Sequence, residues 1–91
     1  MKLIVFYVAE QAAELVKSAM FAVGAGCYDG FERCSWQTLG RGQYQVEGES
    51  LSELNEVKVE IQCRSEVFDQ AINALKSAHP CDQPAYYVLE I

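Results

Sequence analysis

The sequence predicts a single α+β domain, residues 1–91, in which two helices cover one face of a four-stranded antiparallel sheet. Two segments, residues 10–23 and 65–78, repeat apolar side chains at helical spacing. The segments around them are rich in β-branched and aromatic residues or alternate between apolar and polar, which is typical of strands. The order is therefore strand, helix, strand, strand, helix, strand. This βαββαβ order is the ferredoxin-like arrangement.

The first half of the chain predicts a buried strand followed by an amphipathic helix. Residues 2–8 form a continuous apolar run after Lys2, as expected of a strand buried on both faces. Residues 10–23 place alanine, leucine, valine and methionine on one helical face, with Glu10 near the positive end of the helix dipole. Gly24 and Gly26 can adopt the left-handed backbone that ends a helix.

The middle of the chain predicts two strands. Residues 34–39 alternate, and Gly40-Arg41-Gly42 indicates a turn or a bulge before residues 43–46. Residues 47–56 are polar and acidic, so we expect an exposed connection there. Residues 57–63 alternate, with the odd-numbered apolar residues facing inward.

The last third predicts a second helix and a final strand. Ser65 is a candidate helix cap. His79-Pro80 stops the helix, because the residue before proline disfavours helical backbone. Residues 85–91 form the closing strand.

Charge and hydropathy exclude several partners. The formal net charge is −6, and the seven basic residues are scattered, which argues against nucleic acid or an anionic membrane as partner. The apolar run at the start is too short for a signal peptide, and no stretch approaches the roughly 20 residues of a membrane helix. We therefore expect a cytoplasmic protein whose four cysteines are reduced.

The first and last strands carry apolar side chains on both faces, which predicts self-association. A second apolar face shared by neighbouring strands is hard to leave in water. We expect a homo-oligomer that assembles through the helix-free face of the sheet, unless terminal or connecting segments cover that face. The predicted contacts are Ile4, Phe6, Val8, Tyr86 and Val88.

Two segments resemble the PII-like domain of the Nif-three (NGG1-interacting-factor-like) family. They are GAGCYDGFERCSWQTLGRGQY at 24–44 and AHPCDQPAYYV at 78–88. CutA proteins are more distantly similar. The resemblance implies a ferredoxin-like, PII-like module that often forms trimers through its sheets. In full-length Nif-three proteins this module is inserted in a larger protein whose flanking halves hold a two-metal site, and some are described as similar to GTP cyclohydrolase type 2.

The sequence departs from this family in two places. Residues 45–56 are shorter than the corresponding stretch and lack its proline and second glycine pair. Cys81 replaces the family's tyrosine, and Asp82-Gln83 replaces two glutamates.

Catalysis is not expected. A two-metal hydrolytic site needs several histidine and carboxylate ligands, whereas the chain has one histidine, His79. A nucleophilic mechanism would pair His79 with a cysteine such as Cys81. The favoured alternative is that His79 caps the end of the second helix.

A divalent metal is a weaker possibility, with His79, Cys81 and Cys27 as candidate ligands. The sequence contains no C-x-x-C pair. Cys34 and Cys63 fall at strand positions predicted to face inward, where cysteine behaves as a small apolar residue. We expect no cofactor beyond this candidate metal.

A ligand site is predicted around the glycine-flanked arginine. Its candidate residues are Trp36, Gly40, Arg41, Gly42 and Tyr44, with Arg41 as an anion contact and aromatic rings as the wall of a groove. Ordinary sheet packing is the alternative for the aromatic residues. The sequence thus predicts an oligomeric PII/CutA-like module that binds a small ligand or a protein partner. The alternatives are a CutA-type metal-tolerance protein and an accessory subunit of a Nif-three-type two-metal hydrolase.

Overall fold

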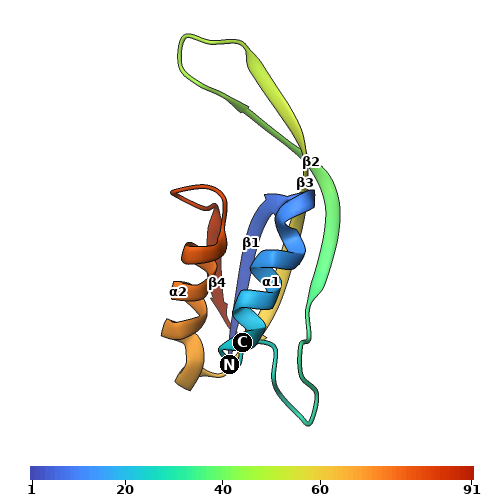
Figure 1. Ribbon diagram of the computed structural model, residues 1–91, viewed down its shortest axis with the longest axis vertical. Helices are drawn as coiled ribbons and strands as arrows, with labels where there is room; N and C mark the ends of the chain where they lie inside the picture. Colours follow the sequence, from blue (N-terminus) through green and yellow to red (C-terminus); the bar gives the residue numbers. More distant parts are fainter.

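The computed structural model describes all 91 residues and confirms the predicted ferredoxin-like fold (Figure 1). The sheet has the order β2-β3-β1-β4, and all its pairs are antiparallel. Its strands are β1 (Lys2–Ala9), β2 (Trp36–Gln45), β3 (Leu51–Cys63) and β4 (Tyr86–Glu90). The helices α1 (Ala13–Ala22) and α2 (Phe68–Ala78) lie on one face, each preceded by a short 3-10 turn.

The hydrophobic core lies between the helices and one face of β1 and β3. On β1 it takes the even-numbered side chains Ile4, Phe6 and Val8, and on β3 the odd-numbered ones from Val57 to Cys63. From the helices it takes Ala13, Val16, Met20, Ala71 and Leu75. Because strand side chains alternate between faces, these residues define the helix-covered face of the whole sheet.

The two helices begin without side-chain caps. Ser65 makes no capping hydrogen bond, so the predicted cap at this residue is wrong; Ser65 begins the 3-10 turn that leads into α2. The predicted stop is confirmed, since His79 has extended backbone and its N–H still donates to the Leu75 carbonyl.

Strands β2 and β3 form one long hairpin that projects beyond the helices (Figure 1). Their pairing runs without a break from Trp36–Glu60 to Gln45–Leu51. The predicted turn or bulge at Gly40-Arg41-Gly42 is therefore wrong, because these residues pair within β2. The predicted connection at 47–56 is also too long: residues 51–56 belong to β3, and the turn contains Gly48 at φ +85°.

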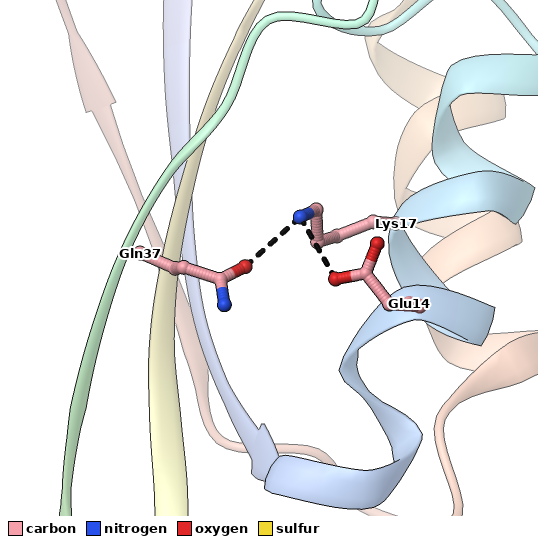
Figure 2. A network of polar contacts seen from close by, with 3 residues as sticks. All are labelled: Glu14, Lys17 and Gln37. Atoms are coloured by element: carbon pink, nitrogen blue, oxygen red, sulfur yellow. Dashed lines mark hydrogen bonds and ion pairs between the residues drawn. The ribbon is translucent and has the colours of Figure 1, made fainter.

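A polar contact holds β2 to the helix layer. Lys17 on α1 donates to Glu14 at 3.1 Å and to Gln37 of β2 at 2.9 Å, as Figure 2 shows. Gln37 pairs with Val59, so its side chain lies on the helix-covered face. This hydrogen bond links the edge strand β2 to α1 beside the base of the hairpin.

The chain ends lie side by side. The Ile91 N–H donates to the Met1 carbonyl at 3.2 Å, and Lys2 forms an ion pair with Glu90. Neither helix has the length and apolar character needed to cross a bilayer.

Candidate assembly face and ligand groove

The helix-free face of the sheet is apolar along β1 and β4. Register places Leu3 opposite Leu89 and Val5 opposite Tyr87, on the side away from the helices. Tyr7 continues this set along β1. Leu89 is 47% exposed and Tyr87 is 43% exposed, and no helix covers them. Val5 is already buried between its neighbours, at 1% exposure, so the exposed part of the set is Tyr87 and Leu89 with the partly exposed Leu3 and Tyr7. We call these five residues the assembly face.

The structure corrects the residues predicted for this face. Ile4, Phe6 and Val8 are buried in the core beneath the helices, and Tyr86 and Val88 pack against the same core. The predicted second apolar face exists, but it is formed by the alternate set of residues. Periodicity could not decide between the sets, because both faces of β1 are apolar and only the position of the helices distinguishes them.

Two tyrosines lie together on the assembly face. Burial raises the pKa of Tyr7, and the neighbouring Tyr87 raises it further, while Lys58 opposes the shift. The Tyr7 phenol therefore stays protonated at neutral pH. Neutral phenols can be covered by a partner at lower cost than charged groups.

The predicted ligand residues do not converge on one site. Trp36, Gly40, Gly42 and Tyr44 lie on the helix-free side of β2, but Trp36 and Tyr44 are about 26 Å apart at roughly 3.3 Å per residue. Arg41 lies on the opposite side and is paired with Glu53 at 2.6 Å. Gly42 lies beside the ends of the Glu56 and Leu54 side chains, which a Cβ there would displace.

His79 has a structural position. It is buried, and its Nε2–H donates to the Tyr7 carbonyl at 2.7 Å. Its Nδ1 accepts the Cys81 N–H at 3.0 Å. Because both ring nitrogens are occupied, His79 ties the loop after α2 to β1 and has no free lone pair for a metal or a proton-transfer step.

The candidate metal ligands do not gather into one cluster within the subunit. The structure has no cluster of three or more His, Cys, Asp or Glu side chains that could hold a metal ion. Cys81 is exposed beside His79, whereas Cys27 lies by α1 next to Phe21 and Glu32. Burial raises the pKa of Cys63, which keeps this core thiol unreactive. Cys34 precedes β2 and is half-buried, so its predicted inward strand position is wrong.

A groove of about 500 Å³ lies where the loop after α1 meets the start of β2. It is lined by Leu3, Tyr28, Arg33, Cys34, Ser35, Trp36, Glu60 and Gln62. Of the predicted ligand residues it contains only Trp36. Sequence reasoning missed Arg33 and Glu60 because they belong to different segments that only the fold brings together.

Comparison with known proteins identifies the type of domain. No family model matches the sequence. A Bacillus cereus protein related to NIF3 superposes with a TM-score of 0.86 at 31% identity, covering 96% of this chain and 24% of that protein. The GTP cyclohydrolase 1 type 2 homolog of Mycobacterium tuberculosis is 28% identical over 96% of this chain. The chain is similar to one quarter of these Nif3-type proteins over nearly its whole length.

The extent of the match differs between the two groups of relatives. This Nif3/CutA-like domain spans about a quarter of the curated relatives it matches, since it covers 25% of the mycobacterial protein. CutA1 from Pyrococcus horikoshii matches over the whole chain and 83% of its own length, with a TM-score of 0.78 at 20% identity. The CutA match shows a shared fold.

Proposed function

We propose that this Nif3/CutA-like domain is a homo-oligomeric binding module that assembles through the assembly face, with a trimer as the favoured state. The observation that carries the proposal is the exposed apolar surface of Tyr87 and Leu89 on β4, which lies beside the partly buried Leu3 and Tyr7 of β1 on the side opposite both helices. Burial of about 500 Å² per subunit would gain about 12 kcal/mol before the cost of association. Small domains bury a modest fraction of their surface, so oligomerisation also adds stability.

Polar and charged residues of β3 border the assembly face. Beside the apolar residues of β1, the helix-free side of β3 carries Lys58, Glu60 and Gln62. An apolar centre with a polar rim is the usual anatomy of a protein interface. We infer that β1 and β4 provide the centre and that β3 provides the rim.

Native mass spectrometry and sedimentation velocity of the purified protein test the proposal. We expect a single oligomer, a trimer by preference, that persists at micromolar concentration. A monomer at that concentration would contradict it. The same mass spectrum reports a retained small ligand, and a stoichiometric divalent metal would instead favour a CutA-type metal-tolerance function.

A second candidate function is that of an accessory subunit. The match to a quarter of a GTP cyclohydrolase 1 type 2 homolog supports a module that works with a larger two-metal hydrolase. Co-purification with a separate, larger enzyme would favour this role, whereas a homo-oligomer alone favours the first. We propose the cytoplasm as the working compartment, in keeping with four cysteines that form no disulfide.

A further inference from the structure

The segment between α1 and β2 contains a tight hairpin loop (Figure 1). Tyr28 and Phe31 exchange both backbone hydrogen bonds, at 3.0 and 2.9 Å. The two residues between them, Asp29 and Gly30, have left-handed backbone with φ +52° and φ +82°. Two positive φ values in succession are the mark of a type I′ turn, for which the pair Asp-Gly is well suited. The loop is therefore a defined turn that holds its side chains in place.

The base of this loop is fixed to the sheet and to α1. The Gly26 N–H donates to the Gln62 carbonyl of β3 at 2.8 Å, and the Gly26 carbonyl accepts the Cys34 N–H at 3.0 Å. A Cβ on Gly26 would lie 3.1 Å from the Phe21 ring of α1. Strand, loop and helix are therefore in close contact here, and the space between loop and helix is preformed, as a ligand site requires.

A pocket of about 400 Å³ lies between the loop and the last turns of α1. Its volume falls within the roughly 300–1,000 Å³ that is usual for small-molecule sites. It is lined by Ser18, Phe21, Ala22, Cys27, Glu32 and Arg33. None of these residues belongs to the assembly face or to its polar rim on β3. The pocket is therefore separate from the proposed oligomer interface.

The pocket contains one anionic and one cationic side chain, and neither belongs to an ion pair of the subunit. The ion pairs of the structure join Lys2 to Glu90, Lys17 to Glu14 and Arg41 to Glu53. Glu32 and Arg33 are in none of them. A ligand with a single charge would complement only one of these two side chains, whereas a zwitterion complements both.

The end of α1 distinguishes the two ends of such a ligand. Ala22 is the last residue of α1 and lines the pocket. The carbonyl groups at the end of a helix carry partial negative charge, which favours a cation nearby. An ammonium group is therefore favoured by both Glu32 and the helix end, which leaves Arg33 for a carboxylate.

We propose that this pocket binds a free α-amino acid with an apolar side chain. Glu32 and the end of α1 bind the ammonium group. Arg33 binds the carboxylate, for which the planar guanidinium offers paired donors. The apolar side chain of the ligand packs on the Phe21 ring, which forms the apolar wall of the pocket.

This inference rests on the binding role proposed above and names the ligand. It gives Arg33 the anion-binding role that the sequence predicted for Arg41, whose guanidinium is paired with Glu53. Because the pocket and the assembly face share no residue, loss of ligand binding would leave the oligomer intact. The two proposals can therefore fail separately.

Isothermal titration calorimetry with L-leucine tests the proposal on the wild-type protein. Isocaproate is leucine without the ammonium group, and isoamylamine is leucine without the carboxylate. We expect saturable binding of leucine that is at least roughly tenfold tighter than the binding of either half. No saturable binding of leucine up to about 10 mM, or equal affinity for leucine and one of its halves, would overturn the proposal.

The cysteines of the chain locate the binding. Cys27 lines the pocket, whereas Cys81 is exposed outside it. Lysine or arginine residues separate the four cysteines, so tryptic digestion and mass spectrometry follow alkylation of each thiol by iodoacetamide. We expect leucine to slow the alkylation of Cys27 and to leave that of Cys81 unchanged. Equal slowing of both thiols, or bound leucine that does not protect Cys27, would contradict the site.

Three variants test the roles of the charged side chains. Arg33→Asn removes the charge with a residue that tolerates the left-handed backbone at this position, φ +58°, and Arg41→Asn removes an equal charge outside the pocket. We expect Arg33→Asn to reduce leucine binding roughly tenfold, to the affinity of isoamylamine, and Glu32→Gln to reduce it to the affinity of isocaproate. Arg41→Asn should leave it unchanged.

Two results with these variants would overturn the site. Equal weakening by Arg33→Asn and Arg41→Asn would show a general effect of charge. A change in oligomer mass on Arg33→Asn, measured by sedimentation velocity, would make the pocket an assembly contact.

Discussion

The body of the domain and the segment 27–56 differ in how they are stabilised. All sixteen buried residues lie outside 27–56, although this segment is about a third of the chain. Strand β3 shows the difference within one element: its odd-numbered residues are buried from Val57 to Cys63 but exposed from Leu51 to Asn55. Burial therefore depends on whether a helix lies above the strand, while the strand itself is continuous.

The comparison shows that the projecting part of the hairpin is held by backbone pairing between β2 and β3 and has no buried core of its own. A two-stranded ribbon alone is marginally stable in water. The projecting part nevertheless exposes several large apolar side chains, namely Leu39, Tyr44, Val46 and Leu51. Self-association of the kind proposed above would cover them.

The largest expected effect is a loss of core packing in the body. Phe6 is fully buried, so Phe6→Ala should lower the free energy of unfolding by about 3–5 kcal/mol. Tyr44→Ala on the hairpin is the matched control and should cost under about 0.5 kcal/mol in the isolated subunit. Urea unfolding followed by circular dichroism measures both. Equal losses would show that the hairpin is packed as tightly as the body.

The next effect lies at the junction between the two regions. Gly26 has φ +79° and no space for a Cβ, whereas Gly30 has φ +82° and no atom within 4 Å. Gly30→Ala should cost about 1 kcal/mol from backbone strain alone. Gly26→Ala should cost at least about 1 kcal/mol more, because the Cys34 backbone must also move. Thermal unfolding of the two variants compares them, and equal shifts would mean that the loop is not tightly anchored.

The smallest effect concerns an exposed ion pair of the body. Hydrogen bonding to Lys2, reinforced by its charge, lowers the pKa of Glu90 from the ordinary value of 4.5. The pair therefore stabilises the fold fully above that value, and the contribution is lost as the pH falls through the lower folded-state pKa. Glu90→Gln should lower stability slightly at pH 7 and not at acid pH. Unfolding measured across this range checks the sign, and a constant difference would contradict it.

The sequence predicted the fold better in the body than in the hairpin. Around α1 and α2, apolar periodicity, glycine and His79-Pro80 marked the elements, because those residues face a packed core. In the hairpin, the glycines Gly40 and Gly42 predict a turn or a bulge, since glycine weakens strands in general. The structure keeps them in β2, where the absence of a side chain at Gly42 leaves room for Glu56.

The candidate sites were harder to predict than the fold. The second apolar face of β1 was visible in the sequence, but which residues form it depended on the side that the helices cover. The groove is lined by Arg33 and Trp36 from one segment and by Glu60 from another, which the β2–β3 register brings opposite Trp36. Such contacts leave no periodic signal in one sequence.

The most direct test of the central claim compares two leucines that differ in face. Leu89 lies on the assembly face, and Leu15 is 67% exposed on α1. Sedimentation velocity of Leu89→Glu and Leu15→Glu should show that the first is a folded monomer and the second retains the wild-type oligomer. Circular dichroism confirms folding of both. An oligomer unchanged by Leu89→Glu, or dissociated equally by Leu15→Glu, would contradict assembly through this face.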